Sequence, residues 1–315
     1  MKTAWVSGAD GFAGSSLVEN LLSHDYSVIA FVRHTPTMNL KQHHKLQISI
    51  GDILDYASVQ KSMTSSDYVF HLASLNGIEE TRRNPILAWN SNTVGTLNVI
   101  NACLENYIPR MLYCSSCHIY GSQSVLPITE KNIPVPNDIY SAAKYSSELI
   151  CNTMMNMNPR LDVVISRAFN HFGLRQRPSW LIPKIILQAI RGSEIILGTQ
   201  KSTRDFNYVS DIVEGYRLIL EKGKRGEVYN LCSGVERSVE NIVRDIVILM
   251  EWKGEIKFTE NRTADINRSF GNADKAKSEL GWEPKTSWKD GLLRTIDYYK
   301  NERMEELKRV HYVTR

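Results

Sequence analysis

The chain has 315 residues, of which 42% are hydrophobic and 23% are charged, an ordinary composition for a globular protein with one large domain or two interlocked ones. Its formal net charge of +4 is too small and too evenly spread to indicate nucleic-acid or membrane binding, although it suits an anionic small-molecule substrate. No apolar run approaches the ~18 residues that a membrane span needs, and the N-terminus enters a strand rather than a signal peptide. The sequence therefore predicts a cytoplasmic protein.

Five cysteines form an odd set without the spacing of a disulfide scaffold, which favours reduced thiols. Cys114, Cys117 and His118 do spell C-x-x-C-H, the pattern of haem c attachment or of a redox pair. Haem attachment needs an export signal, and a metal site needs a second ligand pair that the sequence does not offer. We therefore expect no metal.

In the first half of the chain, short apolar runs alternate with amphipathic stretches. The apolar runs that predict strands are 3–6, 28–32, 68–72, 111–114 and 162–166, and the predicted helices are 15–23, 59–63, 85–105 and 140–156. This alternation is typical of β-α-β units around a parallel sheet. It predicts an α/β fold with a Rossmann-type doubly wound sheet.

The pattern loosens in the second half, where prolines and glycines interrupt residues 181–197 and a further strand is expected at 227–231. We expect a Rossmann domain made of residues 1–173 and 206–234, interleaved with a smaller α/β substrate domain made of residues 174–205 and 235–300. Residues 301–315 are charged and predict a surface helix or a frayed end.

A glycine-rich segment directly follows the first strand. Gly8, Gly11 and Gly14 form a G-x-x-G-x-x-G pattern, with Phe12 and Ala13 inside it, and open a helix expected near Ser15. Glycines permit the tight turn and let backbone N–H groups approach a pyrophosphate, while the helix N-terminus adds a positive dipole end. The segment predicts a site for NAD or NADP.

The end of the second strand bears on the choice of cofactor. NAD enzymes often carry a carboxylate there for the ribose hydroxyls, but this chain has Arg33 and His34. A cation can neutralise a 2′-phosphate, so NADP is slightly favoured, with a merely solvated Arg33 as the alternative. Asp52, followed by Ile53, stands where a third strand would end. Its carboxylate can accept a hydrogen bond from adenine or cap a helix.

A catalytic group is indicated by Tyr140 and Lys144, which share one helix face because they are four residues apart. The ammonium can lower the pKa of the phenol and hold the nicotinamide ribose. A tyrosinate can remove the alcohol proton while hydride leaves carbon for the nicotinamide. Ser115 and Ser116 follow the strand at 111–114, at the edge where α/β sheets bind ligands, and a hydroxyl there can orient the reacting oxygen.

Taken together, the motifs of this chain resemble those of the extended short-chain dehydrogenase/reductases, the nucleotide-sugar epimerase/dehydratase family. Besides the glycine and Tyr-Lys motifs, the matching segments are HLAS at 71–74, NTVGT at 92–96, SSCHIYG at 115–121, RAFNHFG at 167–173, RDFNYVSD at 204–211 and LGWEP at 280–284. The resemblance covers essentially the whole chain.

The resemblance implies further residue roles. Ser116 matches the catalytic hydroxyl of the family, and Leu72, Ala73 and Asn92 fall in its cofactor-binding segments, with helix packing as the alternative for Asn92. The residues that match its contacts to the sugar diphosphate are Asn170, Arg204, Arg262 and Asp265. Guanidinium groups bind phosphate in bidentate fashion, although surface salt bridges remain the alternative for both arginines.

The reaction itself stays open because Cys117 and His118 depart from the family pattern. Family dehydratases usually have an acidic pair, or Ser and Glu, at these positions, and family 4-epimerases have small or neutral residues. Imidazole titrates near neutrality and could replace the glutamate as base at C5, with the thiol as a weak acid.

We expect hydride transfer at C4 of a nucleotide-sugar, a UDP-sugar such as UDP-N-acetylglucosamine being favoured. An NADPH-dependent 4-keto-6-deoxy-sugar reductase is the alternative enzyme, and a non-catalytic NAD(P)-binding regulator is the alternative of another class. The resemblance also implies a homodimer in which the helices 85–105 and 141–155 pair with their counterparts across a two-fold axis.

Overall fold

The computed structural model describes residues 2–34, 39–198, 200–259 and 266–313. Its largest element is a seven-stranded sheet with the strand order β10-β6-β5-β4-β1-β2-β3, in which every neighbouring pair is parallel. The strands are β1 (Thr3–Ser7), β2 (Ser27–Val32), β3 (Leu46–Ile50), β4 (Tyr68–His71), β5 (Arg110–Cys114), β6 (Asp162–Ala168) and β10 (Val228–Leu231). The predicted Rossmann-type fold is confirmed.

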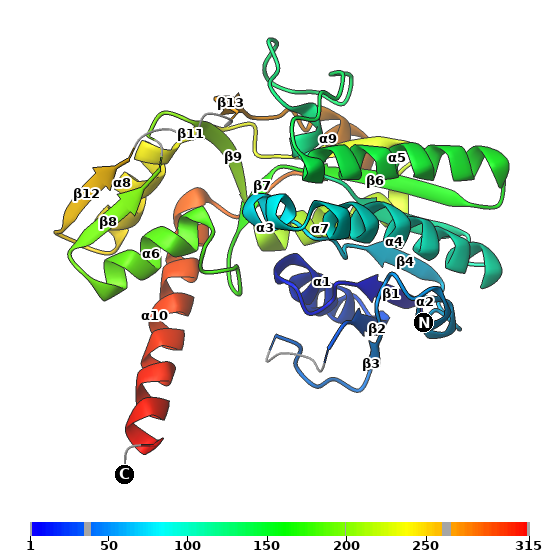
Figure 1. Cartoon of the computed structure of the whole chain (residues 1–315), viewed down its shortest axis with the longest axis horizontal. Helices are drawn as coiled ribbons and strands as arrows, with labels where there is room; N and C mark the ends of the chain where they lie inside the picture. The colour runs from blue at the N-terminus through cyan, green and yellow to red at the C-terminus, as the bar shows by residue number, and fades with distance from the viewer. Residues whose placement is uncertain (1, 35–38, 199, 260–265, 314–315) are drawn as a thin grey trace.

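Helices cover both faces of this sheet, as Figure 1 shows. On one face lie α1 (Phe12–Ser23), α7 (Val209–Lys222) and α9 (Asp274–Leu280), and on the other lie α2 (Tyr56–Ser62), α4 (Pro85–Glu105) and α5 (Ile139–Met157). The side chains of one strand alternate between the faces: Ala4 and Val6 belong to the first hydrophobic cluster, whereas Trp5 belongs to the second. Apolar residues on both faces explain why these strands read as continuous apolar runs.

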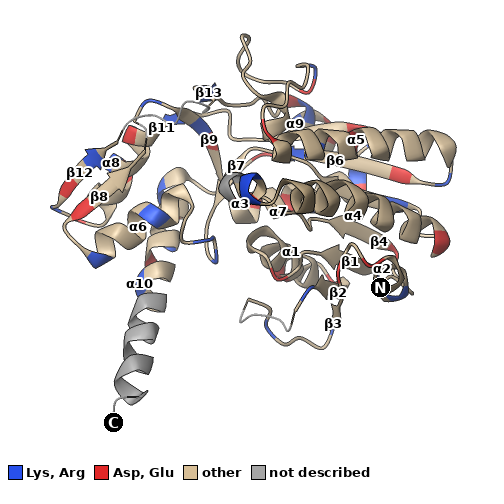
Figure 2. Ribbon diagram, in the orientation of Figure 1, with Lys and Arg blue, Asp and Glu red and all other residues tan. Residues whose placement is uncertain are grey.

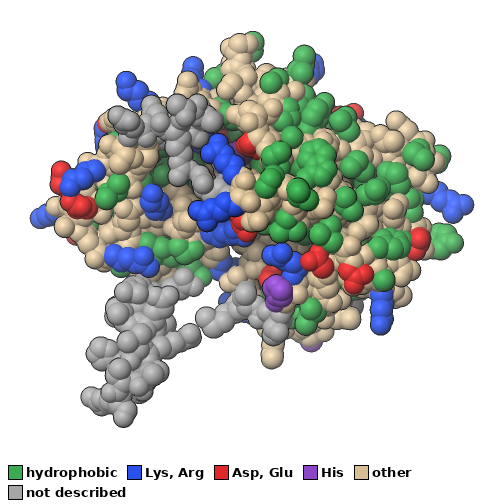
Figure 3. Space-filling model, viewed as in Figure 1, with side chains coloured by type: hydrophobic (Ala, Val, Ile, Leu, Met, Phe, Trp, Pro, Cys, Tyr) green, Lys and Arg blue, Asp and Glu red, His purple; other side chains and the backbone are tan. Residues whose placement is uncertain are grey.

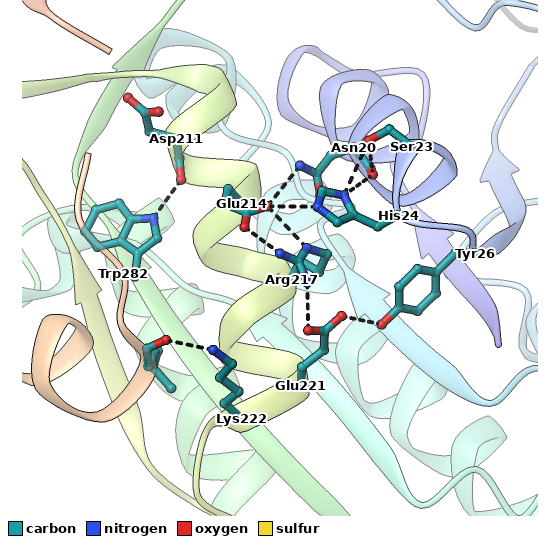
Figure 4. A network of polar contacts seen from close by, with 11 residues as sticks. Asn20, Ser23, His24, Tyr26, Asp211, Glu214, Arg217, Glu221, Lys222 and Trp282 are labelled. Atoms are coloured by element: carbon teal, nitrogen blue, oxygen red, sulfur yellow. Dashed lines mark hydrogen bonds and ion pairs between the residues drawn. The ribbon is translucent and has the colours of Figure 1, made fainter. Parts of the chain in front are cut away.

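Helix α7 illustrates how the first face is held together by polar contacts at its rim (Figure 4). Arg217 pairs with Glu214 and Glu221 of the same helix, and the Tyr26 hydroxyl donates to Glu221 at 2.7 Å. On the other side of α7, the indole of Trp282 donates to the Asp211 carbonyl at 2.8 Å. Helix α7 is thereby fixed both to the α1 layer and to the segment that follows α9.

A smaller part of the molecule, at the left of Figure 1, is built from short strands and three helices. Its strands are β7 (Asn170–Phe172), β9 (Thr203–Tyr208), β11 (Glu236–Ser238) and β13 (Arg268–Ser269) in one sheet, and β8 (Glu194–Leu197) with β12 (Glu255–Phe258) in another. Its helices are α6 (Leu181–Arg191), α8 (Val239–Leu249) and α10 (Trp288–Val313). All three helices bury apolar residues in one shared cluster. The expected domain boundary after residue 173 falls at the end of β7, a strand that pairs with β9 of this smaller part.

Several elements escaped the sequence analysis, and some boundaries differ from it. Most of the short strands of the smaller part and the helices α7, α8 and α9 were not predicted. Neither were α3 (Ile78–Arg83) and the 3₁₀ turn η1 (Cys117–Tyr120), each too short to show a hydrophobic period. Helix α1 begins at Phe12, three residues before the expected start near Ser15. Among the described residues, no helix combines the length and the apolar character of a membrane span.

Candidate active site

A cavity of about 980 Å³ lies between the carboxyl edge of the large sheet and the smaller part of the molecule. Segments that follow β1, β2, β3, β4, β5 and β6 line one wall, and residues of α6, β8 and β9 line the other. The carboxyl edge at the point where strand order reverses, here between β1 and β4, is where open α/β sheets bind their ligands. The fold therefore places the cavity where a dinucleotide and a second ligand can meet.

The glycine segment forms a tight turn at one end of this cavity. Gly8 has φ +66°, and its carbonyl accepts a hydrogen bond from the Gly11 N–H at 3.1 Å. A Cβ on Gly14 would lie 2.0 Å from the Gly8 carbonyl oxygen, so only glycine lets the helix pack this closely on the turn. Gly14 thus sits inside the first turn of α1 rather than ahead of the helix. The α1 N-terminus has no side-chain cap and lines the cavity, which leaves its N–H groups for an anion.

The residues expected at the adenosine end line the same cavity. Arg33 and His34 are exposed there, beside Asp52 and Ile53. The Asp52 carboxylate accepts a hydrogen bond from the Leu54 N–H at 2.9 Å. The cap of helix α2 is instead Asp55, which accepts from the Ser58 N–H at 3.3 Å. Asp52 is therefore not a helix cap, and its carboxylate stays on the cavity side.

Tyr140 lies in the first turn of α5, whose start is fixed by a capping box. Asp138 accepts from the Ser141 N–H at 2.7 Å, and the Ser141 hydroxyl binds the Asp138 backbone in return. Tyr140 and Ser116 both line the cavity. Burial raises the pKa of Tyr140, and its hydrogen bond with the Ser116 hydroxyl acts in the opposite direction. The structure thus places the expected catalytic hydroxyl of Ser116 in the same cavity as Tyr140.

Lys144 lies behind the cavity wall rather than in it. Its side chain is buried, and its ammonium donates to the Cys114 carbonyl at 2.7 Å and stands 5.0 Å from the centre of the Tyr113 ring. Burial lowers the pKa of Lys144 to about 8. The sequence analysis expected Lys144 to lower the pKa of Tyr140. In the structure this pKa is raised instead, because burial of the phenol outweighs every influence that lowers it.

Cys117 and His118 both line the cavity beside Ser116. The Ser116 hydroxyl accepts from the His118 N–H at 3.2 Å, and the imidazole lies edge-on to the Tyr140 ring with 6.0 Å between centroids. Burial raises the pKa of the Cys117 thiol to about 12, so it is a poor acid at neutral pH. The two cysteines of the C-x-x-C-H pattern pack in different hydrophobic clusters. The described residues include no group of three or more metal-ligating side chains.

Asn92 has a different place from the one expected for a cofactor ligand. It is buried in α4, where its amide accepts from the Leu75 N–H at 2.9 Å and donates to the Leu75 carbonyl at 3.1 Å. Both ends of the amide are used, so Asn92 fixes the loop after β4 instead of contacting a ligand. Leu72 and Ala73, on that same loop, do line the cavity.

The expected substrate residues line the cavity on the side of the smaller part of the molecule, as far as the structure describes them. Asn170 and Arg204 line it, and the Arg204 guanidinium donates to the carbonyls of Thr203 and Ile266, each at 2.7 Å. These contacts anchor the guanidinium at the wall. Arg262 and Asp265 fall outside the described residues.

Sequence reasoning missed a group of basic and aromatic residues that line the middle of the cavity: His171, Arg175, Arg177, Trp180 and Lys184. Phe12 of the glycine segment stacks on His171, with 5.5 Å between centroids, and meets Trp180 edge-on. Arg175 bridges to Glu19 at 2.7 Å and to the Asn39 carbonyl at 2.8 Å. No local spacing marks such residues, because their partners come from segments far away in the chain.

Comparison with known proteins gives a consistent set of relatives. A family model described as NAD dependent epimerase/dehydratase family matches residues 4–232. The low-salt glycan biosynthesis protein Agl12 of Haloferax volcanii is 32% identical over 93% of this chain and 97% of its own length. The chain spans only 47% of the trifunctional UDP-glucose 4,6-dehydratase RHM1 of Arabidopsis thaliana, which is 29% identical over 95% of this chain.

Solved structures resemble the whole chain as well. UDP-glucose 4-epimerase of Thermotoga maritima, crystallised with UDP-glucose, has a TM-score of 0.90 and 28% identity over 95% of this chain and 99% of its own. The dTDP-glucose 4,6-dehydratase DesIV of Streptomyces venezuelae, crystallised with NAD and TYD, has a TM-score of 0.90 and 25% identity over 96% of this chain and 98% of its own.

Proposed function

Because the chain belongs to the NAD dependent epimerase/dehydratase family, we propose that it oxidises or reduces C4 of a nucleotide-linked sugar with a nicotinamide cofactor. The observation that carries this proposal is the shared cavity. It brings the uncapped N-terminus of α1, the hydroxyls of Ser116 and Tyr140, and the Arg204 guanidinium together in one space. Each of these features fits a different part of a reaction between a dinucleotide and a sugar diphosphate.

The glycine turn fits NAD or NADP. The N–H groups at the start of α1 would hold the pyrophosphate, and the Asp52 carboxylate would face the adenine. Exposed Arg33 at the end of β2 supports NADP, while NAD is the cofactor crystallised with DesIV. The nicotinamide, when bound, supplies a hydride acceptor and donor.

In this assignment the protein's own groups move the proton. Ser116 orients the sugar oxygen, and Tyr140 takes or returns the hydroxyl proton at that oxygen. Lys144 lies one turn after Tyr140 on α5, and its ammonium is held by the Cys114 carbonyl. It therefore supplies positive charge from behind the cavity wall. Asn92 holds the loop after β4 in place through the Leu75 backbone.

The substrate proposed is a nucleoside-diphosphate sugar, with a UDP-sugar such as UDP-N-acetylglucosamine favoured. The cavity wall that the smaller part of the molecule contributes carries Lys184 of α6 and Arg204 of β9, which suits a diphosphate. Thermotoga maritima UDP-glucose 4-epimerase, a close structural neighbour, was crystallised with UDP-glucose. The net result is an isomerase or a lyase reaction, with a 4-keto-sugar reductase as the second enzyme candidate.

One experiment separates these outcomes. The protein is incubated with UDP-, dTDP-, GDP- and CDP-sugars, with and without NADPH, and the products are read by mass. Loss of water identifies a dehydratase, gain of two hydrogens a reductase, and an isomer of unchanged mass an epimerase. A protein that binds the cofactor but converts none of these sugars is the non-catalytic regulator, and the proposal is then wrong.

We also propose that the chain forms a homodimer through α4 and α5. Helix α4 has one charged residue, Glu105 at its end, and the two charged residues of α5, Lys144 and Glu148, are both buried. Apolar side chains are exposed instead, among them Ile86 at 76% and Leu149 at 50%. In Figure 2 both helices are tan over most of their length, the colour of residues without charge. Figure 3 shows hydrophobic side chains gathered over them. An uncharged apolar face of this kind suits a second copy related by two-fold symmetry.

A further inference from the structure

Glu148 lies one helical turn beyond Lys144 on the buried face of α5, and it is 2% exposed. Arg167 of β6 binds its carboxylate through two hydrogen bonds, Nε to Oε1 at 3.0 Å and Nη2 to Oε2 at 2.6 Å. A bidentate pair of this geometry fixes orientation as well as distance. It therefore locks α5, the helix that carries Tyr140 and Lys144, onto the strand beneath it.

The same arginine also holds the segment that carries Ser116. Its Nη1 donates to the Tyr120 hydroxyl at 2.9 Å, and the guanidinium stands 4.9 Å from the centre of the Tyr120 ring. The Tyr120 hydroxyl donates in turn to Asn230 Oδ1 at 2.8 Å. Tyr120 ends the 3₁₀ turn that Ser116 caps, so Arg167 connects both segments of the proposed redox centre.

The ion pair also sets the charge around Lys144. Burial lowers the pKa of Lys144, while the neighbouring Cys114, Glu148 and Cys151 raise it. Burial raises the pKa of Cys114 to about 12 and that of Cys151 higher still, so both thiols are neutral near pH 7. Glu148 is thus the anion that favours the ammonium form of Lys144.

The other elements around Lys144 contribute no competing anion among the described residues. On β4, His71 binds Ser7 and Thr96, and burial together with the Lys144 charge lowers its pKa to about 3, so the ring is neutral. On β5, burial raises the pKa of Tyr113 far above its usual value. Helix α4 has one charged residue, Glu105, at its far end, and Glu80 of α3 pairs with Arg177. The titratable residues of η1 are Cys117, His118 and Tyr120, none of them a carboxylate.

We propose that Glu148 and Arg167 are positioning residues for the redox centre, with Glu148 keeping Lys144 protonated and Arg167 keeping that carboxylate ionised and in place. Removal of either charge then moves the ionisation of Lys144 to lower pH. A pair with only a structural role lowers stability and turnover but leaves that ionisation where it was. This inference rests on the proposed function, because it requires a reaction that depends on Lys144.

The test is the pH dependence of kcat for the holoenzyme with its nucleotide-sugar substrate. Activity should decline as the pH rises through the pKa of Lys144. This decline is the alkaline limb of the pH profile. In Glu148→Gln, the limb should shift to lower pH by about one unit, because Lys144 loses an anion one helical turn away. In Arg167→Met, it should also move down, because a carboxylate buried without its cation takes up a proton and Lys144 loses the same anion. Both variants have the same predicted direction, so either one decides the question if the other does not fold.

Two controls complete the experiment. Glu214→Gln breaks a carboxylate–arginine contact on α7, away from the cavity, and should leave the limb in place. Glu148→Asp keeps the charge and should restore the wild-type limb at a lower kcat. An alkaline limb that stays at the wild-type pH in the folded Glu148→Gln or Arg167→Met variant overturns the inference.

Tyr140→Phe is measured alongside to test the proposed function separately. If this variant keeps wild-type turnover, the proposed function is wrong. If it is inactive and the limbs of the other variants do not move, only the present inference is contradicted.

Discussion

The two ends of the cavity are built in different ways. At the redox end, Ser116, Tyr140 and Lys144 come from elements fixed by caps, buried hydrogen bonds and a buried ion pair. At the basic end, on the side of the smaller part of the molecule, Arg204 is half-buried and donates to the carbonyls of Thr203 and Ile266, and Arg177 is exposed and pairs with a surface carboxylate. The redox end is preorganised for one chemical step, whereas the basic end can be altered without rebuilding the fold.

This difference predicts that substitutions at the redox end act on kcat and that substitutions at the basic end act on KM. The redox groups change the chemical step itself. Under the proposed function, the basic residues would contact parts of the substrate that do not react. The following variants test that division, beginning with the largest expected effect.

Tyr140→Phe removes the hydroxyl that carries the proton and leaves the ring in place. Turnover should fall by about 10³-fold, within the range general acid–base catalysis supplies, while cofactor affinity stays near the wild-type value. The measurement is kcat beside a cofactor titration. Retention of more than about a tenth of wild-type turnover would be incompatible with the role assigned to Tyr140.

Lys144→Met should lower turnover by about 10²-fold, because the redox centre loses a buried positive charge. The expectation that the ammonium also holds the nicotinamide ribose predicts a loss of cofactor affinity. In the wild type, the pKa of Lys144 is lowered to about 8. The ammonium is the active form, so kcat should fall as the pH rises through about 8. An unchanged cofactor dissociation constant in Lys144→Met would contradict the binding role.

The residues of the redox end could be found from sequence alone because its motifs are local. The glycine turn, the Tyr-Lys spacing and Ser116 after β5 each lie within a few residues, and the alternating pattern places them at one sheet edge. The basic end was not predictable in this way. Arg175, for instance, reaches Glu19 and Asn39 across the cavity, and only the folded chain brings these segments together. The contact of Asn92 with the Leu75 backbone could not be predicted for a related reason, since the loop that uses its amide lies 17 residues away in sequence.

His118 tests whether the redox end also removes a proton from carbon. If its neutral imidazole is the base at C5, His118→Ala should still oxidise C4, and exchange of the C5 hydrogen with deuterated water should fall by about 10²-fold. Mass spectrometry of the product measures the exchange. Equal deuterium at C5 in the wild-type and His118→Ala products would eliminate this role and leave the imidazole as a packing group beside Tyr140.

Arg204→Ala tests the basic end. Loss of a charge-assisted contact to the diphosphate should raise KM by about 10- to 100-fold and change kcat by less than about threefold. Arg191→Ala is a matched control, because Arg191 is an exposed arginine at the end of α6. A drop in kcat with an unchanged KM would show that the two ends are not separate.

Leu149→Glu should have the smallest effect on the chemistry. A carboxylate on the apolar face of α5 should weaken the dimer by about 10-fold or more, while turnover per chain changes by less than about twofold. Ile248→Glu is the matched control, because Ile248 on α8 is 65% exposed and lies away from that face. Sedimentation at micromolar concentration gives the result, and a monomeric wild type would contradict the proposed dimer.

The central claim, hydride transfer at C4, is tested most directly with nucleotide-sugars that carry deuterium at C4. Wild-type protein loaded with oxidised cofactor is mixed with each sugar, and absorbance in the reduced-nicotinamide band is followed. The account predicts a transient rise with the true substrate, a slower rise when C4 carries deuterium, and no rise in Tyr140→Phe. A sugar that is converted with no reduced cofactor and no isotope effect would contradict it.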